Sequence, residues 1–125
     1  MKVLVVDDSA GVRGRIATLL RDIDGVELVL EAADATRAID LSRALRPEFV
    51  ILDLDLPDRS GLEILPLLKR LLRAPTVLVL TNHTGDAYAQ RCRDLGADHF
   101  FDKSTQFEAA VDLVRSAVVA RGRSI

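Results

Sequence analysis

The sequence predicts an α/β domain in which helices cover both faces of one parallel sheet. Short runs rich in β-branched and other apolar residues alternate with longer stretches whose apolar residues recur at helical spacing. This alternation is typical of βα units, and right-handed crossovers between five such units give a doubly wound sandwich of three layers. The expected strands are Lys2–Val6, Val26–Ala32, Phe49–Asp53, Thr76–Leu80 and His99–Phe101.

The segment after each expected strand has one apolar face, which predicts a helix packed against the sheet. The positions on these faces are Val12, Ile16, Leu19, Leu20 and Ile23, then Ala35, Ala38, Ile39 and Ser42, then Leu62, Leu65, Leu68 and Leu72, then Tyr88, Cys92 and Leu95, and finally Ala110, Val111, Val114 and Val118. Asp34 is expected to cap the second helix. Thr105, with Glu108 three residues later, has the pattern of a capping box for the fifth.

Length and composition indicate one domain. The 125 residues are 49% hydrophobic, enough to bury a single core. We expect this domain to cover residues 1–121, with a short tail at 122–125 and no effector domain. With 17 Lys and Arg against 19 Asp and Glu, the formal charge is -2, which argues against direct binding of nucleic acid.

The expected location is the cytoplasm. The single cysteine, Cys92, has no partner for a disulfide within the chain. No apolar stretch approaches the roughly 20 residues that a membrane span requires, so no membrane partner is expected.

Three carboxylates are expected at one edge of the sheet. Asp7 and Asp8 follow the first apolar run, and Asp53 ends the third. Since ligand sites in such sheets lie at the carboxyl ends of the strands, these side chains should meet there with Thr81 and Lys103. Like charges so close resist joint ionisation unless a cation joins them, and such a shell favours Mg²⁺, with Mn²⁺ as the alternative.

The residue types around Asp53 fit phosphoryl transfer. An aspartate at a strand end can act as a nucleophile and form an aspartyl phosphate. The reaction needs mainly positioning and neutralisation of charge on the transferred oxygens. A metal held by Asp8 and Asp53, the ammonium of Lys103 and the hydroxyl of Thr81 would supply these functions.

Taken in order along the chain, these residues resemble a bacterial response-regulator receiver domain over essentially the whole sequence. The resemblance rests on Asp7-Asp8, Leu52 to Gly61, Thr81, and Gly96 to Lys103. It implies a flavodoxin-like receiver fold with strand order 2-1-3-4-5. It also implies that the protein is a phosphoacceptor switch and not an enzyme with substrate turnover.

The resemblance implies a role for each site residue. Asp53 would be phosphorylated. Asp8 would bind the metal directly and Asp7 through a metal-bound water, while Asp55 would offer its backbone carbonyl. Lys103 would pair with the phosphoryl oxygens. Thr81 and Phe100 would form a conformational switch. The Thr81 hydroxyl would turn toward the phosphoryl group, and the Phe100 ring would move inward.

The implied partners are a histidine kinase or phosphotransfer protein and a downstream protein target. The fourth helix, fifth strand and fifth helix would form the changing surface and would also offer a face for a homodimer.

Three positions depart from the commonest pattern. Ser104 replaces a proline that often follows a cis bond, Asn82 stands where a small residue is frequent, and His83 lies where the family tunes phosphoryl lifetime.

Other functions compete with this one. Asp53-Leu54-Asp55 is a D-x-D pattern of the kind found in haloacid-dehalogenase-like phosphohydrolases, in which the second aspartate is an acid/base. Those enzymes place the motif on the first strand and usually need more chain for a cap. The chain could also be a binding module that works without phosphate, or a receiver cut from a longer DNA-binding regulator.

Overall fold

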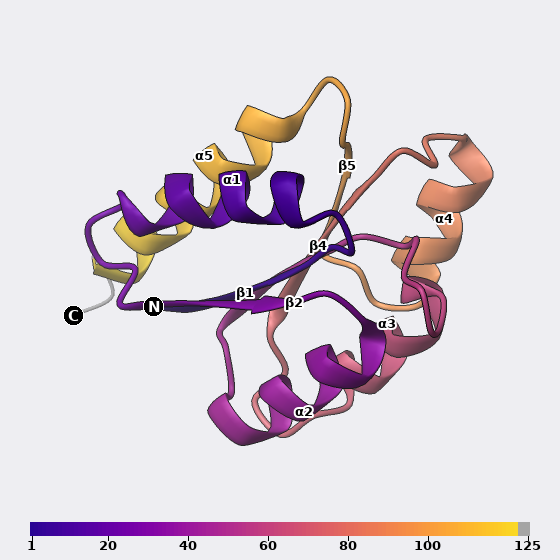
Figure 1. The fold of residues 1–125 in the computed structure, drawn as a ribbon, viewed down its shortest axis with the longest axis horizontal. Helices are drawn as coiled ribbons and strands as arrows, with labels where there is room; N and C mark the ends of the chain where they lie inside the picture. The colour runs from indigo at the N-terminus through magenta and orange to yellow at the C-terminus, as the bar shows by residue number, and fades with distance from the viewer. Residues whose placement is uncertain (123–125) are drawn as a thin grey trace.

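A computed structural model describes residues 1–122 as five parallel strands and five helices in strict alternation (Figure 1). The elements are β1 (Lys2–Val6), α1 (Ala10–Arg21), β2 (Leu28–Ala32), α2 (Ala35–Leu45), β3 (Phe49–Leu52), α3 (Gly61–Lys69), β4 (Thr76–Thr81), α4 (Asp86–Asp94), β5 (His99–Asp102) and α5 (Phe107–Gly122). The sheet order is β2-β1-β3-β4-β5, which confirms the predicted fold class. No helix within residues 1–122 is both long and apolar enough to cross a membrane.

The two faces of the sheet carry separate cores. Helices α1 and α5 cover one face, and α2, α3 and α4 cover the other (Figure 1). Strands β1 and β3 are buried almost throughout because helices lie on both sides of them. Their alternate residues therefore enter opposite cores, as Val5 and Val6 do. The residues that follow β1 and β3 therefore extend from two deeply buried strands.

Short polar side chains fix the starts of the first two helices. Ser9 accepts from the Val12 backbone N–H at 3.4 Å, and Asp34 accepts from that of Arg37 at 2.7 Å, as predicted. The start of α2 has a second acceptor, because Asp58 from the β3–α3 loop accepts from the backbone N–H groups of Ala35 at 2.9 Å and Thr36 at 3.0 Å. These bonds lower the pKa of Asp58 to about 2.

Some predictions at the helix ends are wrong. Thr105 does not cap α5, which begins at Phe107. The residues before that helix form a turn in which the Gln106 N–H donates to the Asp102 carbonyl at 2.7 Å. Leu72 is 79% exposed, because α3 ends at Lys69 and the chain turns before the apolar stripe is complete. Helix α5 reaches Gly122, one residue into the predicted tail, and the rest of that tail lies outside the described residues.

The apolar face predicted for α4 is only partly correct. Cys92 is fully buried, and burial raises the pKa of its thiol. Tyr88, one turn earlier, is 40% exposed and stacks on His83 instead, with ring centroids 4.8 Å apart. The first turn of α4 therefore projects beyond the core, beside the carboxyl end of the sheet.

Candidate phosphorylation site

The parallel register brings the predicted carboxylates together. Val6 of β1 is paired with Leu52 of β3, so the residues that follow these strands emerge side by side. The Asp53 backbone N–H donates to the Val6 carbonyl at 2.9 Å, which extends the ladder into the site. Carboxylate oxygens of Asp7, Asp8 and Asp53 all lie within 4.8 Å of one another. Asp7 and Asp53 are buried, whereas Asp8 is exposed.

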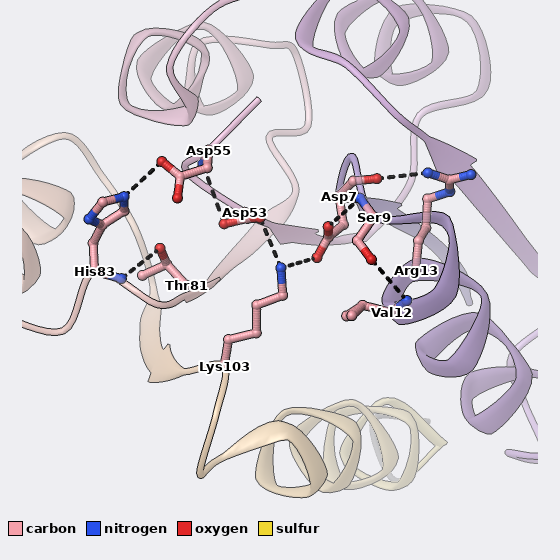
Figure 2. A network of polar contacts seen from close by, with 9 residues as sticks. All are labelled: Asp7, Ser9, Val12, Arg13, Asp53, Asp55, Thr81, His83 and Lys103. Carbon is pink, nitrogen blue, oxygen red and sulfur yellow. Dashed lines mark hydrogen bonds and ion pairs between the residues drawn. The ribbon is translucent and has the colours of Figure 1, made fainter. Parts of the chain in front are cut away.

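Lys103 lies across the two buried carboxylates. Its Nζ is 2.6 Å from Asp7 Oδ2 and 3.0 Å from Asp53 Oδ2 (Figure 2). Burial acts to lower the pKa of Lys103, but the hydrogen bonds to Asp7 and Asp53 outweigh it, so the net shift is upward. The lysine therefore stays charged and offsets part of the repulsion between the two carboxylates.

The surroundings of Asp53 disfavour its ionised form. Burial raises its pKa, and this effect exceeds the opposite influence of the Lys103 ammonium. The Asp55 backbone N–H, which donates to Asp53 Oδ1 at 3.3 Å, gives some further support to the anion. Because Lys103 offsets only part of the cost of burying this negative charge, a bound cation or esterification of the carboxylate would stabilise the site.

Asp7 is held on its other side by α1. Its Oδ1 accepts from the Ser9 N–H at 2.9 Å, and its backbone carbonyl accepts from Arg13 Nη1 at 2.8 Å (Figure 2). Arg13 is in turn paired with Glu31 at 3.2 Å. Sequence reasoning did not single out Arg13, whose only signal is its place one turn into the helix after the acid pair. Its hydrogen bond helps to hold the Asp7 backbone in place.

Thr81 ends β4 at the same edge and is fully buried. Its carbonyl accepts from the Lys103 N–H at 2.9 Å, so the same strand end also orients the lysine. Its Oγ1 accepts from the His83 N–H at 3.2 Å. Among the described residues no hydrogen bond joins Thr81 to Asp53, so the hydroxyl is held by its own loop.

His83 connects this loop to the one after Asp53. Its Nε2 lies 2.7 Å from Asp55 Oδ1 (Figure 2). The His83 ring also stacks on that of Tyr88. The prediction that Tyr88 would lie on the buried face of its helix is therefore wrong, and the Asp55 side chain has a partner that the sequence did not indicate. The positions of Asp55 and His83 in the sequence are consistent with this contact. Asp55 lies two residues after Asp53 and His83 two residues after Thr81, and the strands β3 and β4 that lead to them are neighbours.

Comparison with known proteins agrees with this geometry. The family model described as "Response regulator receiver domain" matches residues 3–115. This chain belongs to the response regulator receiver family. Strand order, acid cluster and lysine all fit that family, whose role is two-component signalling.

Two named relatives are longer than this chain. Response regulator protein VraR from Staphylococcus aureus is 34% identical over 125 residues, which are all of this chain and 59% of the relative. A Methanospirillum hungatei protein named as a protein-glutamate methylesterase/protein-glutamine glutaminase is 36% identical over 105 residues, 82% of this chain and 31% of that protein. The chain thus spans about a third to three fifths of these relatives.

A solved relative has a modified aspartate. The crystal structure of a Burkholderia pseudomallei response regulator, with a phosphorylated aspartic acid, calcium ion and citrate, superposes with a TM-score of 0.81 at 28% identity. The match covers 98% of this chain and 71% of that one. The phosphorylated aspartic acid, the calcium ion and the citrate belong to that protein.

The donor set of this receiver fits a hard divalent cation. Three carboxylates supply only oxygen ligands, and one of them, Asp8, is open to solvent, so a bound ion could keep waters in its shell. The described residues near it contribute no thiolate. The site is thus chemically suited to Mg²⁺ and unsuited to the metals that prefer sulfur.

The last strand carries the remaining predicted residue. Phe100 is partly buried against the core beneath α3 and α4, while Phe101 packs toward α1 and α5. No peptide bond in residues 1–122 is cis, so the bond between Lys103 and Ser104 is trans. Asp102 Oδ1 accepts from the Ser104 N–H at 2.9 Å and from its hydroxyl at 2.7 Å, which shapes the turn after the lysine.

Gly61, the first residue of α3, packs directly against the backbone of the segment that carries Asp53. Its N–H donates to the Leu54 carbonyl at 2.8 Å. A Cβ at this position would lie 2.5 Å from the Asp53 carbonyl oxygen and 2.8 Å from Leu54 Cα. Because both contacts are with backbone, only glycine fits here without moving the segment that carries Asp53.

Proposed function

We propose that this receiver accepts a phosphoryl group on Asp53 from the phosphohistidine of a histidine kinase or phosphotransfer protein. The observation that carries the proposal is the buried, incompletely compensated Asp53 carboxylate with Lys103 at 3.0 Å and two further carboxylates beside it. A mere ion site would not need the lysine. The phosphorylated aspartic acid of the Burkholderia relative supports the same chemistry.

The transfer exchanges one bond to phosphorus for another. A carboxylate oxygen of Asp53 forms the new bond, while the bond from phosphorus to the donor imidazole nitrogen breaks and leaves its electron pair on that nitrogen. The Lys103 ammonium, which pairs with the Asp53 carboxylate before the transfer, would then pair with an oxygen of the phosphoryl group. Bound Mg²⁺, held by Asp8 and Asp53 with the Asp55 carbonyl and with Asp7 through water, would neutralise further charge.

The output of the reaction is a change in a protein-binding surface. Thr81 Oγ1 now accepts from the His83 N–H. A phosphoryl group on Asp53 would offer that hydroxyl a stronger, charged acceptor. Movement of Thr81 would free space for the Phe100 ring and alter the face made by α4, β5 and α5. Phosphate can shift this equilibrium only by binding one state better than the other.

The test compares two aspartates by the same substitution. The wild type, Asp53→Asn and the control Asp40→Asn, a change at an exposed position on α2, are incubated with Mg²⁺ and acetyl phosphate, and phosphate incorporation is read by intact mass. We expect one phosphate on the wild type and on the control and none on Asp53→Asn. No incorporation into the wild type, with or without a panel of phosphorylated histidine kinases, would contradict the proposal.

Two further measurements separate the competing functions. Steady turnover of a phosphomonoester that is lost in Asp55→Asn would indicate a phosphohydrolase; the engagement of the Asp55 carboxylate by His83 supports the opposite expectation. Unchanged affinity for a downstream partner in Asp53→Ala would indicate binding that is independent of phosphate. The proposal concerns the receiver unit at residues 3–115 and is the same for that unit within a longer protein.

A further inference from the structure

A second hollow, separate from the site around Asp53, lies at the opposite edge of the sheet. It is bounded by the end of α2 and by the turn between α3 and β4, and its volume is about 200 Å³. Its lining residues include Pro47 and Pro75, which come just before β3 and β4, whereas Asp53 follows the far end of β3. The length of the strands therefore separates the two sites, and the chemistry at Asp53 does not involve this one.

Three arginines line this hollow: Arg43, Arg46 and Arg73. None of their guanidinium groups forms an ion pair with any residue in 1–122, and no acidic residue is among the lining. The nearby carboxylate of Glu48 is already engaged by the Lys2 N–H and by Arg121. The hollow is thus lined by three arginines that have no ion-pair partner among the described residues, in a protein whose formal net charge is -2.

Two of these arginines stand where the backbone disfavours a side chain. Arg46 has φ 48° and Arg73 has φ 58°, and they are the only residues in 1–122 other than glycine with positive φ. Glycine or asparagine would relieve the strain of this conformation. The helix dipole accounts for an arginine at the end of α2 but not for Arg73, which belongs to no helix. Both arginines therefore adopt this backbone conformation at an energetic cost.

The rest of the lining is mainly apolar. Ser42 contributes a buried hydroxyl that has no hydrogen-bond partner in the described chain. Leu71 and Leu72 lie along the same hollow, and Leu72 is 79% exposed. These features suit a ligand that has a strongly anionic end and a small apolar part.

We propose that this hollow binds a small organic phosphate, a phosphomonoester with a compact apolar group. A phosphate dianion matches several guanidinium groups, whose planar forks bind phosphate oxygens in pairs, better than a single carboxylate does. The volume of the hollow favours a ligand smaller than a typical drug, because drug-sized ligands occupy pockets of about 300–1,000 Å³. A compact ester fits 200 Å³, whereas a whole nucleotide or a folded partner does not.

The test titrates phenyl phosphate into the ¹⁵N-labelled receiver in EDTA, so that divalent ions cannot draw phosphate to Asp53. We expect saturable amide shifts confined to residues 42–47 and 71–75, with weaker binding of inorganic phosphate and of benzoate, which has the same ring but one negative charge. The double variant Arg46→Gly with Arg73→Gly removes two guanidinium groups while relieving the backbone strain, so it should remain folded. Its affinity should fall by about tenfold or more.

The matched control removes two other exposed, unpaired arginines, Arg37→Ala with Arg91→Ala, and should bind as the wild type does. Three results would overturn the proposal: shifts absent from both segments, affinity unchanged in the double glycine variant, or loss of binding equal in the control, which would mark a general charge effect. A phosphoserine peptide that binds far more tightly than phenyl phosphate would instead assign the hollow to a phosphorylated protein. Binding of beryllium fluoride with Mg²⁺ at Asp53 should be the same in all variants.

Discussion

The Asp55 carboxylate and the His83 imidazole are joined at 2.7 Å between Oδ1 and Nε2, and this contact ties together the two loops that border Asp53. Each residue lies two positions beyond a strand-end site residue. His83 also stacks on Tyr88 at the start of α4, so the ring connects the site directly to a helix of the proposed output face. The contact occupies the Asp55 carboxylate near the position that an anionic phosphoryl group must approach.

We expect His83→Ala to weaken the binding of beryllium fluoride in the presence of Mg²⁺. Without the imidazole, the Asp55 carboxylate is unpartnered and repels the incoming anion. Both side chains are more than a third exposed, so the pair is worth at most about 1 kcal/mol, or roughly fivefold in affinity. Isothermal titration calorimetry measures the effect. Asp55→Asn should abolish it in the double variant, and a fivefold loss that persists there would refute the charge argument.

Mg²⁺ should stabilise the folded receiver through the carboxylate cluster. Binding to the native state alone adds about 2.7 kcal/mol to the free energy of unfolding when the ion is at 100 times its Kd. Urea denaturation followed by circular dichroism, with and without Mg²⁺, measures this gain. Asp8→Asn should reduce it sharply, while Asp40→Asn should leave it intact. An equal gain in Asp8→Asn would mean that the ion acts elsewhere.

Gly61→Ala should destabilise the fold by about 1–3 kcal/mol and impair phosphorylation of Asp53, because the added Cβ lies 2.5 Å from the Asp53 carbonyl oxygen. Gly14→Ala is the matched control. A Cβ at Gly14 meets nothing within 4 Å, and the residue lies inside α1, so this change should stabilise by about 0.5–1 kcal/mol. Thermal unfolding and acetyl phosphate labelling of both variants would show whether the close approach matters.

Asp58 should contribute stability that depends on pH. Its folded pKa of about 2 lies below the ordinary value of 3.8, because backbone N–H groups at the start of α2 bind the anion. A lowered pKa means that the contribution is complete above about pH 4 and is lost as the pH falls through 2. The urea midpoint of Asp58→Asn should therefore lie below that of the wild type at pH 7, and the gap should close toward pH 2. A gap of constant size across this range would exclude ionisation as the cause.

The alternation of short apolar runs with helical stripes determined the fold class, and the ends of those runs determined where Asp7, Asp53 and Thr81 would lie. This inference succeeded because burial imposes strong periodicity on a parallel sheet and its helices, and because the carboxyl ends of parallel strands share one edge. The acid cluster was predictable for the same reason. A pattern spread over many residues survives small errors in the bounds of any one element.

Tertiary structure alone decided the contacts made by loops. The pairing of Asp55 with His83, the exposure of Tyr88 and Leu72, the capping of α2 by Asp58 and the strained arginines beside the second hollow all depend on where irregular segments turn. A loop has no periodic burial to reveal which way a side chain points, and its partners are distant in sequence. The chain therefore specified the carboxylate cluster in its sequence, while the contacts that surround that cluster emerged only from the folded arrangement.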